Sequence, residues 1–119
     1  MNLTHEGSKI VNREILLGFW KIHILHHAAE GPVVGQWMLN ELRRHGYDLS
    51  PGTLYPLLKR MEKNGWLRSE TDPERGPKSP RRYYLTSLGR EVLSCLSDKV
   101  EELHRELAAG SSCRTTENS

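Results

Sequence analysis

Basic side chains in the middle of the chain have the types and spacing needed to contact a polyanion. Lys59, Arg60 and Lys63 lie within about one helical turn of each other, where they could neutralise phosphates or reach guanine acceptor atoms. Four more cations follow closely: Arg75, Lys78, Arg81 and Arg82. The net charge is only +2, yet residues 51–90 hold nine basic and four acidic side chains. Solvated surface charge is the alternative for each cluster, and their joint occurrence favours a nucleic-acid surface.

Three histidines form a second chemical pattern. His23 and His27 are four residues apart, so they share one face of a helix at a spacing that can hold a divalent metal, with His26 beside them. The alternative is that these are structural histidines, since no cysteine or carboxylate cluster beside them completes a ligand set. His104 could join only if dimer packing brings it close. An organic effector in an aromatic cavity is the competing hypothesis for what the protein senses.

Catalysis is not expected. The chain has no Ser/His/Asp set, glycine-rich phosphate loop or paired carboxylates at useful spacing, so no catalytic residue, cofactor or assigned metal centre is predicted. A chain of 119 residues and 13.7 kDa has room for one domain. No apolar run is long enough to span a bilayer, and Met1–Ser8 does not resemble a signal peptide. We therefore expect a cytoplasmic protein without a membrane partner.

The periodicity of apolar residues predicts four helices and a hairpin. The helices are expected at residues 9–29, 33–45, 51–64 and 87–108, with Ser50 and Thr86 as caps of the last two and Pro51 at a first helical position. Residues 66–71 and 81–85 are expected to pair as strands around a proline-rich loop. The fold class predicted is mainly α with a two-stranded β-wing (α+β), a winged helix-turn-helix followed by a C-terminal dimerisation helix.

The third predicted helix has a buried face and a basic face. A stripe at i, i+3, i+4 and i+7 begins at Leu54 and ends at Met61, and the 100° step per residue turns the lysines outward. In a winged helix this helix enters the major groove and the hairpin reaches the flanking backbone. The residues expected to contact DNA are Ser50, Pro51, Gly52, Thr53, Tyr55, Pro56, Lys59, Arg60, Lys63, Arg75, Lys78, Arg81 and Arg82.

The first and last helices have more apolar surface than one small core needs. A second subunit is the natural cover for such faces. The residues expected at a dimer interface are Ile15, Phe19, Ile22, Val92, Leu96, Val100, Leu103 and Leu107. The resulting division is a DNA-binding domain at residues 9–85, a dimerisation helix at 86–109 and a disordered tail at 110–119.

Two segments of the chain resemble a known family. GYDLSPGTLYPLLKRMEKNGWL, followed by RRYYLTSLGREVL, is similar to the PadR family of bacterial transcriptional regulators, and the resemblance covers residues 15–107. It implies a homodimeric winged-helix repressor on a palindromic operator in double-stranded DNA, with the last helix packed on the partner's first helix. It also implies release by an effector, and the short last helix is typical of the smaller size class.

Two alternatives stay open. The basic surface could bind an acidic protein, which would make the chain a winged-helix interaction module without specific DNA binding. For the effector, a divalent metal near His23 and His27 competes with a small organic molecule.

Overall fold

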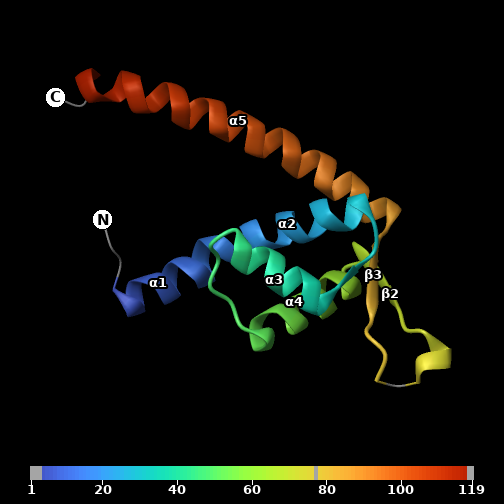
Figure 1. The fold of residues 1–119 in the computed structure, drawn as a ribbon. Coiled ribbons are helices and arrows are strands. Elements are labelled where there is room, and N and C mark those ends of the chain that lie inside the picture. Colours follow the sequence, from blue (N-terminus) through green and yellow to red (C-terminus); the bar gives the residue numbers. More distant parts are fainter. Residues whose placement is uncertain (1–3, 77, 118–119) are drawn as a thin grey trace.

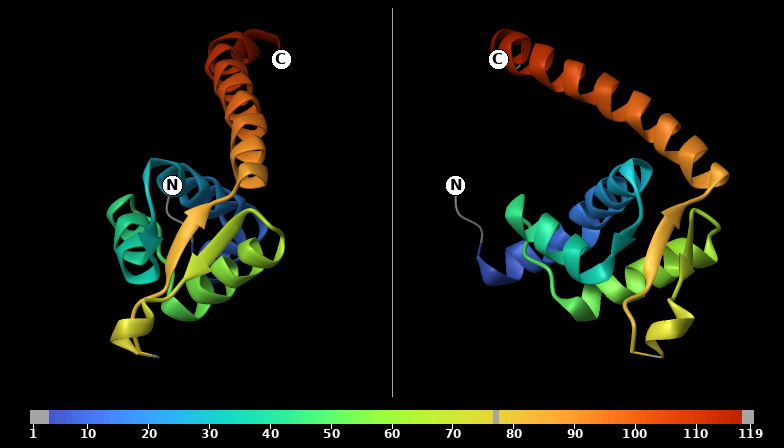
Figure 2. Two further views of the ribbon diagram at one scale, coloured as in Figure 1. Left: turned by 90° about the vertical axis from the view of Figure 1, so that its right-hand side faces the viewer. Right: turned by 45° about the vertical axis from the view of Figure 1, so that its right-hand side comes forward.

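The computed structural model describes residues 4–76 and 78–117, with side chains as far as residue 110. A helical body carries a small sheet on one side, and a long C-terminal helix extends away from it (Figure 1). The loop of the wing lies at the end of the molecule opposite to the projecting part of this helix in all three views (Figure 2). The predicted class, helix-rich with a β-wing, is confirmed.

The first predicted helix is longer and less regular than its pattern indicates. α1 (His5–Val11) begins at Thr4, whose hydroxyl accepts the backbone N–H of Gly7 at 2.9 Å. A π-helical segment, η1 (Asn12–Leu16), joins it without a break to α2 (Leu17–Glu30). The helix thus starts four residues before Lys9, because a threonine cap precedes it.

A third strand departs from the sequence prediction. Val33 and Val34 form β1 (Val33–Val34) instead of the first turn of the second helix, and α3 (Gly35–Arg44) begins after them. β1 pairs antiparallel with β3 (Arg82–Leu85), which also pairs with β2 (Leu67–Glu70), so the sheet order is β1-β3-β2. Val33 and Val34 are both β-branched, which favours extended backbone.

The core lies between α2, α3, α4 (Pro51–Lys63) and the sheet. The predicted stripe of α4 is fully buried in it: Leu54, Leu57, Leu58 and Met61 are at most 1% exposed. Pro56 lies inside α4 without ending the helix, which loses one backbone hydrogen bond there. Burial of one whole face therefore outweighs the cost of an interior proline.

The last helix, α5 (Ser87–Glu117), begins where sequence analysis places it. Thr86 Oγ1 accepts the N–H of Gly89 at 2.9 Å and donates to the carbonyl of Gly65, which ties the helix start to the end of α4. Gly89 is buried there, and an added Cβ would lie 2.1 Å from the carbonyl oxygen of Trp66. Only glycine allows so close an approach.

α5 forms an arm that leaves the body. Val92, Leu93 and Leu96 pack partly buried against the core, whereas the rest of the helix projects beyond it. The radius of gyration, 17.4 Å, exceeds the roughly 13.5 Å of a compact chain of this length. The helix continues through residues 110–117, which sequence analysis assigns to a disordered tail, and no proline stops it; residues 118–119 lie outside the described part. No helix in the described part is long and apolar enough to cross a membrane.

Candidate nucleic-acid interface

The outward face of α4 is a basic surface. Lys59, Arg60 and Lys63 are exposed on the side opposite to the buried stripe. Glu62, on the same helix, is turned toward the wing, where it accepts the Ser69 hydroxyl at 2.6 Å and the Ser69 backbone N–H at 3.1 Å. The one acidic side chain among these cations is thus held toward the wing by hydrogen bonds, and the outward face of α4 offers cations.

The start of α4 is open to solvent. Ser50, Pro51, Gly52, Thr53 and Pro56 are all exposed. Ser50 occupies the cap position, but its hydroxyl lies 3.4 Å from that of Thr53 and does not cap a backbone N–H. The predicted side-chain cap is therefore wrong in this detail, and both exposed hydroxyls, bonded only to each other, lie where a phosphate could bind at the positive end of the helix dipole.

Tyr55 has one face on protein and one in solvent. It is 42% exposed, and its ring lies over Gly35 at the start of α3. A Cβ at Gly35 would be 2.4 Å from Tyr55 Cε1, so the ring can lie there only because residue 35 is glycine. Tyr55 is thus held at the edge of the basic face with its other side available to a ligand.

The wing carries the second group of cations. Arg75, Lys78, Arg81 and Arg82 are exposed around the loop between β2 and β3, beside the short helix η2 (Pro73–Arg75). Arg81 donates to Ser69 Oγ at 2.9 Å, the same hydroxyl that Glu62 holds.

Arg68 is different, because it pairs with Glu70 and lies 4.3 Å above the Tyr84 ring. The structure therefore distinguishes a structural arginine in the strand from cations that are available at the wing.

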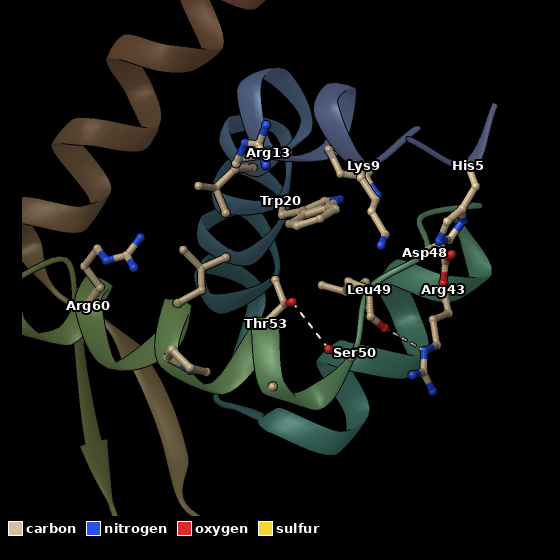
Figure 3. A pocket seen from close by; sticks show the side chains of 15 residues that line it. His5, Lys9, Arg13, Trp20, Arg43, Asp48, Leu49, Ser50, Thr53 and Arg60 are labelled. Atoms are coloured by element: carbon tan, nitrogen blue, oxygen red, sulfur yellow. Dashed lines mark hydrogen bonds between the residues drawn. The ribbon is translucent and has the colours of Figure 1, made fainter. Parts of the chain in front are cut away.

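A groove beside the start of α4 adds cations that sequence analysis missed. Its volume is about 620 Å³, and Figure 3 shows Lys9, Arg13, Arg43 and Arg60 around it, from α1, η1, α3 and α4. Arg43 donates to the carbonyl of Leu49 at 3.2 Å, so it also supports the turn before α4. The i, i+4 spacing of Lys9 and Arg13 indicates that both lie on one helix face, but it does not show that this face lines a groove together with α4.

The predicted dimer residues divide into two groups. Ile15, Phe19, Val100, Leu103 and Leu107 are 47 to 64% exposed. Ile22, Val92 and Leu96 are half-buried, and the last two pack against the core of the same chain. α2 and the first part of α5 therefore already contact each other within one chain. The exposed apolar side chains of the first group lie beyond this contact, and no residue in the described part of the chain covers them.

The histidines gather around a residue that sequence analysis did not include. His23 and His27 on α2 face His45 at the end of α3, and ring centroids of His23 and His45 are 5.1 Å apart. His26 is exposed on α2. Burial and the neighbouring imidazoles, that of His45 first, lower the pKa of His23. His104 lines a shallow groove with His23 and His26 but is not in this cluster.

Comparison with known proteins agrees with this geometry. The family model of the "Transcriptional regulator PadR-like family" matches residues 24–95. The transcriptional regulator Rv3488 of Mycobacterium tuberculosis is 46% identical over 100 residues, which are 84% of this chain and 92% of the relative.

Solved structures of the same family share the fold. A PadR-like transcriptional regulator from Bacillus cereus superposes with a TM-score of 0.71 at 26% identity, over 81% of this chain and 94% of that one. A PadR family regulator from Eggerthella lenta gives 0.65 at 29% identity, over 87% and 90%. With the matched segment containing α3, α4, the wing and the start of α5, this chain belongs to the PadR-like family of transcriptional regulators.

Proposed function

We propose that this regulator is a homodimeric repressor that binds a palindromic operator and leaves it when an effector binds. The observation that carries the proposal is that α4 and the loop of the wing, whose cations are exposed, lie on the other side of the body from the projecting part of α5 (Figure 2). One end of the molecule can then contact DNA while the other contacts a second copy. In this arrangement residues 9–85 bind DNA and residues 86–109 dimerise.

The DNA contacts follow from the two basic groups. α4 enters the major groove, with Lys59, Arg60 and Lys63 directed at bases and phosphates, and Tyr55 at its edge. The wing cations reach the flanking backbone. Lys9 and Arg13 extend the surface beside the start of α4, where the exposed hydroxyls of Ser50 and Thr53 support a phosphate contact.

The dimer is supported by apolar surface on the arm. Leu103 and Leu107 are 51% and 64% exposed on a helix that has left the body, and a helix in water depends on packing for most of its stability. The exposed Ile15 and Phe19 near the start of α2 offer a matching apolar surface. A twofold pairing of α5 with the partner's first helix would bury both patches.

The direct test is selection of genomic DNA fragments by the purified full-length protein, followed by footprinting on the enriched fragments. We expect one enriched motif with twofold symmetry, protected over two half-sites about one helical turn apart or a multiple of it. A protein that enriches no motif would contradict sequence-specific binding. Protection of a single asymmetric half-site would contradict the dimer but not the sequence-specific binding.

The repressor role needs a separate measurement. A reporter gene behind the enriched motif should be silent when the regulator is present and active when it is absent or when its effector is added. Reporter activity that rises with the regulator would identify an activator instead.

An interaction module is the second candidate function, since the exposed basic surface would also suit an acidic protein. The fragment selection separates the two functions, because an interaction module should retain fragments without regard to sequence. The double variant Lys59→Ala/Arg60→Ala should remove specific binding while the circular dichroism spectrum stays unchanged.

A further inference from the structure

Three imidazoles converge at the junction of α2 and α3. His23 and His27 come from successive turns of α2, and His45 is the residue that ends α3. One ring nitrogen from each lies within 4.8 Å of the other two. Two helices that are separate in sequence therefore bring three nitrogen ligands to one point, at distances that a bound ion could close with small side-chain movements.

His27 is oriented by a carboxylate. Its Nδ1 lies 3.2 Å from Glu30 Oε1, and its side chain is only 12% exposed. With the proton on Nδ1 donated to Glu30, Nε2 keeps its lone pair. That Nε2 atom is buried and forms no hydrogen bond to any residue in the described part of the chain. A carboxylate that fixes the outer nitrogen of an imidazole is the usual arrangement behind a metal-binding histidine.

A second carboxylate lies beside the cluster and supplies negative charge. Glu41 Oε2 is 3.2 Å from His45 Nε2 and 3.4 Å from His27 Nε2. Arg44 donates to both oxygens of Glu41, at 2.9 and 2.8 Å, which fixes the carboxylate in place. On the other side, the Tyr47 hydroxyl lies 3.3 Å from His23 Nε2. The three imidazoles are thus surrounded by polar groups that could hold them and partly offset the charge of a cation.

We propose that His23, His27 and His45 bind a divalent transition-metal ion of the zinc type, with Glu41 as the adjacent carboxylate. Three imidazole nitrogens suit zinc, cobalt, nickel or copper, whereas magnesium and calcium require mainly oxygen ligands. Three protein ligands leave a further position for water or for Glu41. The site shares no residue with the basic surfaces of α4 and the wing, so it is independent of the DNA contacts.

A competing arrangement on the same helix is weaker. His26, His27 and Glu30 also lie close enough to hold an ion. However, His26 and Glu30 are 58% and 65% exposed, and all three belong to one helix. In the proposed site Glu30 instead orients His27. The two arrangements make opposite predictions for His26, which provides a test.

The test uses the full-length protein without a histidine tag. Zn²⁺ binding is measured by calorimetry, and Co²⁺ binding by the visible absorption bands that report coordination geometry. We expect one ion per chain, and we expect the Co²⁺ absorption bands of a four-coordinate site. His45→Ala should weaken Zn²⁺ binding by more than about 100-fold, because loss of an outer-shell partner alone costs about 10- to 100-fold. His26→Ala is the matched control and should bind as the wild type does.

Three results would overturn the site: no Zn²⁺ binding by the wild type, unchanged affinity in His45→Ala, or loss of binding in His26→Ala. Circular dichroism of each apo variant ensures that the comparison is made on folded protein, and His45→Gln serves if the alanine variant does not fold. Because no DNA is present, failure of this test leaves the operator proposal standing, and failure of operator binding leaves the metal site standing.

Discussion

The salt dependence of operator binding offers a quantitative test of the proposed interface through Lys59. This side chain is exposed on α4 and forms no ion pair with any residue that the structure describes. Lys59→Ala should therefore remove one phosphate contact per subunit and leave the fold unchanged. Each lost contact lowers the slope of log K against log[salt] by about 0.9.

The magnitude depends on the number of subunits bound. A dimer on a twofold operator loses two contacts, so its slope should become shallower by about 1.8. Between about 50 and 200 mM salt, wild-type affinity should then fall about tenfold more than that of the variant. A single bound subunit would change the slope by only about 0.9, a difference of about threefold to fourfold over the same range. The slope therefore reports both the contact and the stoichiometry.

Fluorescence anisotropy of a labelled operator duplex at four or five salt concentrations is a suitable assay. Arg105→Ala is the matched control: it also removes one positive charge, but from an exposed position on α5, where Arg105 pairs loosely with Glu101 at 3.8 Å. The control should keep the wild-type slope. If Lys59→Ala and Arg105→Ala show the same slope as the wild type, α4 does not contact phosphates through Lys59 and the proposed interface is wrong.

Three further predictions concern the fold and the dimer. Gly35→Ala should lower the free energy of unfolding in urea by about 1–3 kcal/mol, because its Cβ would overlap the Tyr55 ring; an unchanged midpoint would show that the ring moves freely. Thr86→Ala should cost about 1 kcal/mol in the same assay through loss of the α5 cap, and a neutral result would contradict the capping role. Leu103→Lys should shift sedimentation velocity toward the monomer, whereas Glu102→Lys should not; equal behaviour would remove α5 from the interface.

Local patterns predicted the two faces of α4 well. Burial of one face imposes a period of 3.6 residues, so the stripe from Leu54 to Met61 and the outward direction of Lys59 could both be derived from spacing. The threonine cap of α5 was also predictable, because a cap depends only on the few residues that follow it.

Features that join distant segments were not predictable in this way. β1 has two residues, too few for an alternating pattern, and it exists because β3, about fifty residues later, pairs with it. His45 completes the histidine cluster from a different helix, so the spacing of His23 and His27 could not include it. The groove that Lys9 and Arg43 line could not be predicted either, because it forms only where separate helices come together in the fold.

The close contact between Gly89 and the carbonyl of Trp66 fixes the start of α5 at the base of the wing. Any change in the angle of α5 would therefore occur about this contact. A helix of 31 residues spans about 45 Å. A turn of about 5° at that contact would then move the far end by about 4 Å. In the proposed dimer, a shift of a few ångströms where the two α5 helices meet would reach α4 of each subunit as a small rotation, because the close contact of Gly89 with the Trp66 carbonyl leaves little room for independent movement. In that dimer the angle of the two α5 helices would set the distance between the two proposed DNA-binding surfaces, and the spacing of the operator half-sites would report it.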